Sequence, residues 1–194
     1  MTDLGRRDLL KLLAAAPLPL LFPPAALAGA RRAAREAVAA PGQHVLRFLT
    51  EHEFRTVRLL ADLVLPRDER SGSASEAGVP EFIDTILHLY PADQDRARGG
   101  LAWLDAHCRR RFGKPFAEGS ASEQAGVLDE IAWPARARPE VSHGVAFFSA
   151  FRDLVATGFW SSKVGVEDLG YVGNTFVAEW TGCPPEVLER LRVR

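Results

Sequence analysis

The residues that begin and end helices are the sequence feature that most constrains the fold of this chain. Residues 50–53 and 120–123 are capping boxes, in which a Thr or Ser and a Glu three positions later satisfy the first backbone amides of a helix. Apolar residues at helical spacing follow each box, and Pro66 or Pro134 ends each run. No stretch alternates with period two for long enough to form a sheet, so the pattern predicts an all-α protein.

Further segments with helical patterns complete this prediction. Pro80 suits the first position of a second helix, and Gly113 suits the left-handed C-cap of a third helix that begins near residue 93. A fifth helix is predicted over about 140–157, and a short closing helix from Pro184. We therefore predict one domain over 50–194, an irregular bundle of about five or six helices preceded by a cleavable signal peptide.

Residues 1–28 have the pattern of an export leader. Arg6 and Arg7 form a twin-arginine pair, and the moderately apolar segment that follows ends in Ala-Leu-Ala at Ala28. The alternative is a membrane-spanning helix, which needs about 20 apolar residues and hydrogen bonds that the four prolines of this segment would remove. We expect recognition by the twin-arginine translocase, cleavage after Ala28, a periplasmic location and no stable membrane span.

The segment 29–49 has no sustained apolar face. It is rich in Ala and Arg up to residue 40 and then contains a Pro-Gly pair. We predict a linker or a short helix here.

The charge balance bears on the class of partner. Lys and Arg total 24 against 25 for Asp and Glu, so the chain has no strong positive field to hold a phosphate backbone or an anionic membrane. Nucleic acid is therefore disfavoured as a partner.

The patterns that usually hold a cofactor do not occur in the sequence. No Gly-rich strand-to-helix turn, phosphate loop, nucleophile elbow or haem-attaching cysteine pair occurs, and no two of the five His lie at i and i+4 on one helix. We accordingly expect no catalytic, cofactor-binding or metal-binding residue in this chain.

The two cysteines have several interpretations. Cys108 falls on the apolar face of its helix, while the adjacent His107 points about 100° away, so a buried structural thiol is favoured over a thiol and base pair. In an oxidising compartment Cys108 and Cys183 could instead form a disulfide, and Cys183 could cross-link a partner chain.

An aromatic, glycine-punctuated segment follows residue 158. One interpretation is that its rings fill the core at the ends of helices, and the other is that they form a partner interface, where Trp and Tyr are enriched. The candidate interface residues are Phe159, Trp160, Tyr171, Asn174 and Trp180.

Three motifs carry a family resemblance. The blocks LLADLVLP at 59–66 and AGVPEFID at 77–84, followed by 148–159 with Arg-Asp-Leu and Gly-Phe, resemble the gluconate 2-dehydrogenase subunit 3 family. Within that family, the segments 98–104 and 165–171 are similar to the small subunits of glucoside 3-dehydrogenases.

The resemblance implies an accessory role. Members of the family accompany a large flavoprotein of the glucose-methanol-choline type, which binds FAD and lacks a signal of its own, and they act in its maturation and export. We therefore expect a non-catalytic subunit that binds, stabilises and escorts a large FAD-dependent sugar dehydrogenase, with a cytochrome as a candidate electron acceptor. The alternatives are a periplasmic enzyme that acts on sugars by itself and a ligand-binding module.

Overall fold

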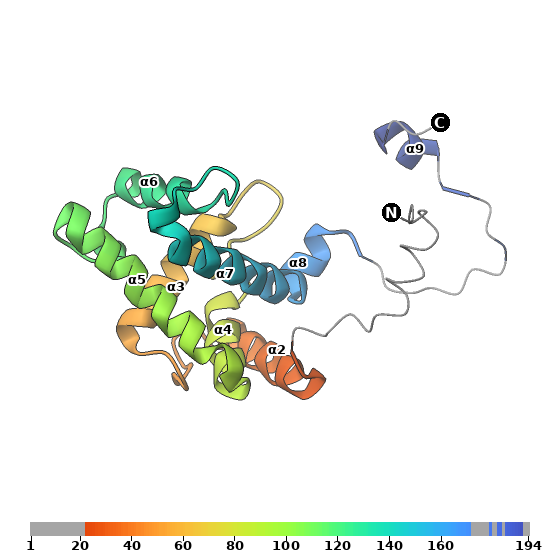
Figure 1. Cartoon of the computed structure of the whole chain (residues 1–194). Helices are drawn as coiled ribbons and strands as arrows, with labels where there is room; N and C mark the ends of the chain where they lie inside the picture. The colour runs from red at the N-terminus through yellow and green to blue at the C-terminus, as the bar shows by residue number, and fades with distance from the viewer. Residues whose placement is uncertain (1–21, 172–178, 180–181, 184, 192–194) are drawn as a thin grey trace, which may run out of the picture.

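The computed structural model describes residues 22–171, 179, 182–183 and 185–191, and in this part of the chain it contains eight α-helices, three short 3₁₀ turns and no strand (Figure 1). The α-helices are α2 (Pro24–Ala39), α3 (Glu51–Val64), α4 (Val79–Leu89), α5 (Gln94–Phe112), α6 (Ala121–Ile131), α7 (Ser142–Trp160), α8 (Lys163–Asp168) and α9 (Pro185–Leu191). The 3₁₀ turns are Pro91–Asp93, Phe116–Glu118 and Pro139–Val141. The all-α prediction is confirmed, with more helices than the sequence predicts.

Both predicted capping boxes form. The Thr50 hydroxyl accepts the backbone N–H of Glu53 at 3.2 Å, and the Glu53 carboxylate accepts the backbone N–H of Thr50 at 2.8 Å. Ser120 and Glu123 make the same reciprocal pair at the start of α6. These bonds satisfy backbone amides that the first turn of a helix leaves without a partner, and they fix the starts of α3 and α6 where the sequence predicts them.

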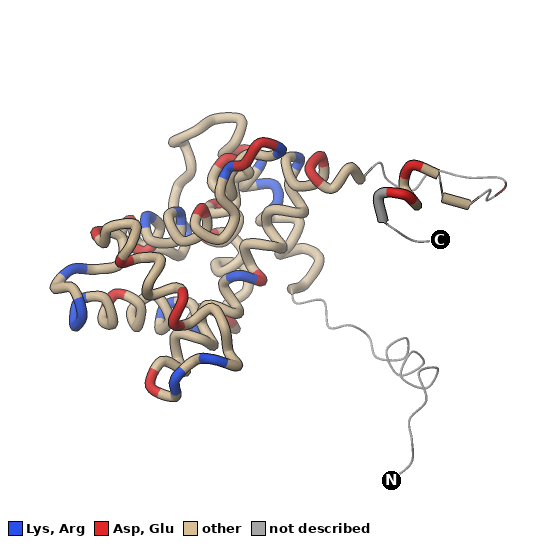
Figure 2. Tube along the Cα trace, turned by 90° about the horizontal axis from the view of Figure 1, so that it is seen from above, with Lys and Arg blue, Asp and Glu red and all other residues tan. Residues whose placement is uncertain are grey.

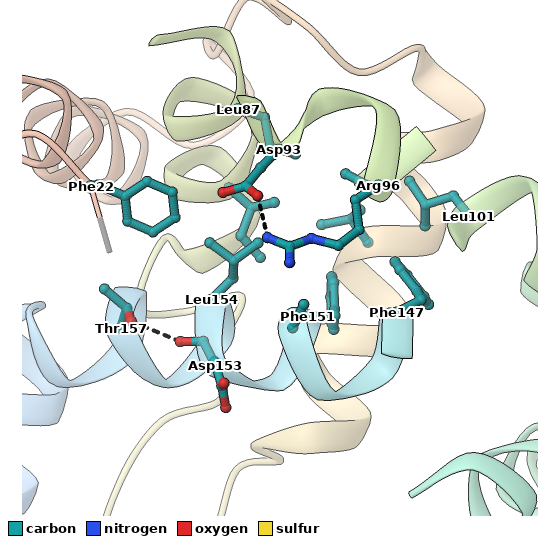
Figure 3. Close-up of a pocket in the computed structure, with 14 residues that line it drawn as sticks. Phe22, Leu87, Asp93, Arg96, Leu101, Phe147, Phe151, Asp153, Leu154 and Thr157 are labelled. Atoms are coloured by element: carbon teal, nitrogen blue, oxygen red, sulfur yellow. Dashed lines mark hydrogen bonds and ion pairs between the residues drawn. The ribbon is translucent and has the colours of Figure 1, made fainter. Parts of the chain in front are cut away.

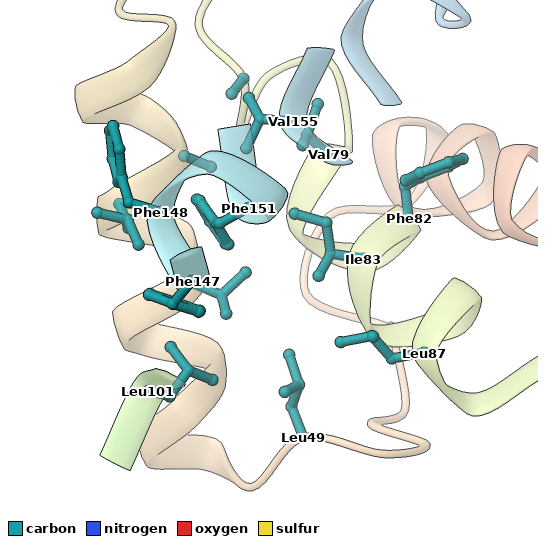
Figure 4. Packing of buried hydrophobic residues seen from close by; sticks show 14 of the residues in the cluster. Leu49, Val79, Phe82, Ile83, Leu87, Leu101, Phe147, Phe148, Phe151 and Val155 are labelled. Atoms are coloured by element: carbon teal, nitrogen blue, oxygen red, sulfur yellow. The ribbon is translucent and has the colours of Figure 1, made fainter. Parts of the chain in front are cut away.

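α7 lies at the centre of the bundle and contacts α3, α4, α5, α6 and α8. Its residues Phe147, Phe151 and Val155 are all buried. Figure 4 shows these side chains facing others from α4, such as Ile83, and from α5, such as Leu101. The aromatic side of this helix, which the sequence predicts, therefore supplies much of the single hydrophobic core.

The crossing of α5 and α7 depends on a glycine. A Cβ atom added at Gly100 would lie 1.9 Å from Cδ2 of Phe147, far inside contact distance, whereas one added at Gly99 would meet nothing within 4 Å. The two glycines of this doublet therefore differ: Gly100 lets α7 approach the backbone of α5, whereas a side chain at Gly99 would point into open space.

Residues 29–49, predicted as a linker or a short helix, contain most of a packed helix. α2 has 16 residues and lies against α4 (Figure 1), with alanines buried at helical spacing. These alanines are Ala26, Ala30, Ala33 and Ala34. The segment is therefore part of the domain, and only residues 40–49 form a loop.

A glycine of α4's N-terminus explains how closely α2 packs. Gly78 has φ +75°, and a Cβ atom added to it would lie 2.6 Å from the carbonyl oxygen of Ala34. Only glycine accepts both this conformation and this approach. The sequence predicts that α7 ends near residue 157, but the helix passes through Gly158 and ends at Trp160. A further helix, α8, follows it and is not predicted from the sequence.

Candidate functional site

The aromatic residues predicted as an interface separate into two groups. Phe159 is 2% exposed and belongs to the core, where its ring packs edge-on against Trp160 with centroids 5.6 Å apart. Trp160 and Tyr171 are 41% and 59% exposed. The core interpretation therefore holds for Phe159, while Asn174 and Trp180 lie outside the described residues.

α8 places a further apolar residue on the same part of the chain. The Ser162 hydroxyl accepts the backbone N–H of Gly165 at 3.1 Å and caps α8, which begins three residues after the end of α7. Leu169, just after α8, is 61% exposed. These exposed side chains, Trp160, Leu169 and Tyr171, all lie within residues 160–171, and we call them together the α7–α8 surface. Trp and Tyr side chains are enriched at the contact centres of protein interfaces.

The α7–α8 surface is attached to the body of the domain. The Arg70 guanidinium donates to the backbone carbonyl of Asp168 at 2.9 Å and lies 3.2 Å from its carboxylate. This contact links the loop between α3 and α4 to the end of α8, across nearly a hundred residues of sequence. The orientation of α8 is therefore set by tertiary contacts as well as by its own cap.

The two cysteines lie in different environments. Cys108 is 3% exposed in α5, and burial, with a smaller contribution from the Asp105 carboxylate, raises the pKa of its thiol to about 11. The neighbouring His107 ring stacks on Trp103 with centroids 4.9 Å apart. Cys183 is exposed, and both thiols are free in the structure. Cys108 thus has the environment of a structural thiol.

An apolar pocket of about 120 Å³ lies between α4, α5 and α7 (Figure 3). We call it the α4–α7 pocket, and its lining includes Leu87, Leu101, Phe151, Leu154 and Thr157. Phe22, from the segment before α2, lines its other end, and the ion-paired Asp93 and Arg96 add charge to the lining. Its volume is below the roughly 300–1,000 Å³ of typical small-molecule sites.

The remaining sequence predictions concern charge, metals and the leader. Figure 2 shows Lys and Arg interspersed with Asp and Glu along the described helices. In the described ranges, no group of three or more His, Cys, Asp or Glu side chains is placed to hold a metal ion, and no helix is long and apolar enough to cross a membrane. Arg6 and Arg7 lie outside the described residues, and Ala28 is an exposed residue inside α2.

A comparison with protein-family models identifies the helical body. The model described as Gluconate 2-dehydrogenase subunit 3 matches residues 51–179, from the start of α3 to beyond α8. The chain belongs to the gluconate 2-dehydrogenase subunit 3 family. The description is that of one subunit in a multi-subunit dehydrogenase. No curated protein and no solved structure gives a significant match.

The motifs that carry the family resemblance have structural roles here. In the 77–84 motif, Gly78 permits the close packing of α2, which lies before the matched residues. In the 59–66 motif, the Asp62 carboxylate accepts the backbone N–H of Ser75 at 2.7 Å and so holds the loop that leads into α4. These two motifs therefore contribute to the packing of α2 on α4 and to the loop between α3 and α4.

The last residue of the 77–84 motif, Asp84, is completely buried and anchors a loop. Its carboxylate accepts the backbone N–H groups of Arg47, Phe48 and Leu49 at 2.8–3.0 Å and the Nε2–H of His44 at 2.9 Å. All of these donors belong to the segment between α2 and α3. The carboxylate is occupied by internal hydrogen bonds, so its observed role is to fix this segment.

Asp105 of α5 plays a similar part. Its carboxylate accepts the backbone N–H of Phe116 at 3.1 Å and pairs with the His52 ring of α3. No motif in the sequence marks Asp84 or Asp105 as a buried hydrogen-bond acceptor. The available signal is an Asp at a position where the helical pattern requires an apolar residue, since a buried carboxylate needs several donors.

Proposed function

We propose that this chain is a non-catalytic accessory subunit that binds, stabilises and escorts a large FAD-dependent sugar dehydrogenase of the glucose-methanol-choline type. The observation that carries the proposal is membership of the gluconate 2-dehydrogenase subunit 3 family over residues 51–179. The environment of the acidic groups supports it, because Asp84 and Asp105 are occupied by internal hydrogen bonds. In this proposal FAD is bound by the partner, and electrons leave the partner for an acceptor such as a cytochrome.

The twin-arginine pair at Arg6 and Arg7 supports the escort role. The twin-arginine route carries folded proteins, so a flavoprotein bound to this chain could cross with its cofactor in place and reach the periplasm. A partner that binds only the folded state also stabilises that state by mass action. One leader would then serve both chains.

We propose the α7–α8 surface as the contact for the flavoprotein. Trp160, Leu169 and Tyr171 are large and exposed, and Trp and Tyr are among the residue types that contribute most to affinity when a partner covers them. The resemblance of segments 98–104 and 165–171 favours a partner of the glucoside 3-dehydrogenase type.

Co-expression with a large FAD-dependent dehydrogenase of this type tests binding and escort separately. Replacing Arg6 and Arg7 by Lys should leave both chains in the cytoplasm as an intact complex, as judged by fractionation and flavin fluorescence. Full periplasmic dehydrogenase activity without this chain would refute the escort role.

Two matched variants test whether the α7–α8 surface contacts the flavoprotein. Trp160→Ala should weaken the complex by at least about tenfold, the loss typical of a central interface aromatic. Trp133→Ala removes another exposed indole, 60% exposed and outside the α7–α8 surface, and should leave affinity unchanged. Equal affinities for wild type and both variants would place the contact elsewhere, and sugar oxidation by the isolated chain would refute a non-catalytic role.

A further inference from the structure

The end of the predicted leader is folded into the domain. We call residues 22–28 the leader end. Pro23 is the N-cap of α2, and Pro24 occupies the first helical position, where a proline costs no hydrogen bond. The helix then continues unbroken through Ala28 to Ala39. The backbone N–H of Leu27 already donates to the carbonyl of Pro23 at 3.1 Å. The predicted cleavage bond between Ala28 and Gly29 is therefore inside a helix.

The leader end also packs against the rest of the domain. Phe22 is only 4% exposed, and its ring packs edge-on against Tyr90 at the end of α4, with centroids 5.3 Å apart and planes at 89°. Figure 3 shows Phe22 beside the α4–α7 pocket, with Leu154 and Thr157 of α7 close by. Ala26 is 7% exposed and belongs to the hydrophobic core.

We propose that the α4–α7 pocket and Tyr90 form an intramolecular binding site for the leader end, and that the folded domain thereby withholds the bond after Ala28 from signal peptidase. The exported chain then keeps residues 22–28. This inference rests on the leader being an export signal, as proposed above, and it changes the cleavage position that the sequence predicts.

The physical reason is that the peptidase requires a conformation that α2 excludes. Proteases cut segments that are accessible and locally unfolded. The two small residues of the Ala-x-Ala motif are Ala26 and Ala28, and Ala26 faces the core. Signal peptidase can cut the Ala28–Gly29 bond only after the first turns of α2 unwind and Phe22 separates from Tyr90. The cleavage rate then follows the small population of this open form.

A cleavage assay on the purified full chain tests the inference without any export step. Signal peptidase in detergent is added to wild type and to a synthetic peptide of residues 18–35, and Gly29 N-termini are followed by mass spectrometry. We expect the folded chain to be cut at least about tenfold more slowly than the peptide, because opening limits cleavage. Equal rates would overturn the proposal.

A variant of Tyr90, against which the leader end packs, tests whether this packing slows cleavage. Tyr90→Ala removes the ring that packs on Phe22 and leaves the peptidase's recognition sequence intact, so cleavage after Ala28 should accelerate severalfold. Leu63→Ala, which trims a partly exposed leucine of α3, is the matched control and should be cut at the wild-type rate. Circular dichroism verifies that both variants are folded. If a folded Tyr90→Ala chain were cut no faster than wild type, the proposed binding site for the leader end would be refuted.

The N-terminus of the exported chain gives the second readout. Intact mass should place it at or before Phe22, and Ala28→Gln, an exposed change that suits a helix but not the peptidase, should leave that N-terminus unchanged. A wild-type N-terminus at Gly29 would overturn this inference and leave the escort role standing. Failure of export itself would bear on the proposed function, while the assay on the purified chain would still decide the inference.

Discussion

Asp84 shows how much of the fold can depend on one carboxylate. It is fully buried, and three backbone amides and one imidazole donate to it from the segment between α2 and α3. Without an acceptor at this position, those backbone groups would be buried and unpaired. Leaving such donors unsatisfied costs more than the net gain of the bonds themselves.

We predict that Asp84→Asn destabilises the domain by about 2–4 kcal/mol, because the amide nitrogen of Asn would face N–H groups that need an acceptor. Urea unfolding monitored by circular dichroism measures this change. Asp129→Asn, at an exposed carboxylate of α6, is the control and should change the unfolding free energy by less than about 0.5 kcal/mol. Similar effects in the two variants would contradict the anchoring role.

The two thiols should differ in reactivity. With its pKa raised to about 11 by burial, the Cys108 thiol is almost entirely protonated at pH 8, whereas Cys183 is exposed. We expect a disulfide reagent such as Ellman's to label one thiol in the native protein and a second only after denaturation. Cys183→Ser should remove the fast reaction, and a native protein with no reactive thiol until a reductant is added would instead indicate a bridge.

At the scale of the element, the Gly99–Gly100 doublet of α5 separates helix propensity from packing. We predict that Gly100→Ala destabilises the domain by about 1–3 kcal/mol, because its methyl group would overlap the Phe147 ring. Gly99→Ala meets nothing and should stabilise α5 by about 0.5–1 kcal/mol. Thermal unfolding of the pair measures both effects, and shifts of the same sign would contradict the close crossing of α5 and α7.

The elements that the sequence predicts are those whose signals are local. The capping boxes of α3 and α6 and the C-cap at Gly113 each depend on residues within one turn, so their bonds follow from the sequence. The length and the packing of α2 are not predicted, because its buried face consists of alanines, which give little apolar contrast. In addition, Gly78, against which Ala34 of this helix packs, lies more than forty residues away from Ala34.

Less of the candidate site than of the fold can be predicted from the sequence, because the site depends on long-range packing. Trp160 and Tyr171 are exposed, as an interface would require, but only the structure separates them from buried Phe159. Likewise the hydrogen bonds of Asp84 join residues 35–40 positions apart, and no local pattern predicts which loop a buried Asp holds. Long-range packing decides these cases.

At the scale of the whole molecule, the domain should begin before residue 29. We predict that a chain starting at Phe22 is the most stable. One starting at Gly29 should lose about 5 °C in Tm with the burial of Phe22 and Ala26, and one starting at Pro41 should lose about 10 °C or more. Scanning calorimetry of the three chains measures this order. Equal melting temperatures would mean that α2 contributes nothing to the core.

The packing of α2 on α4 also has a consequence for timing at the ribosome. The N-terminal helix emerges first, but Gly78 is translated 44 residues after Ala34 and Tyr90 is translated 68 residues after Phe22, a delay of several seconds at about 5–20 residues per second. During that interval the nascent leader has no partner within its own chain, so a targeting factor can engage it before the bundle closes over its end.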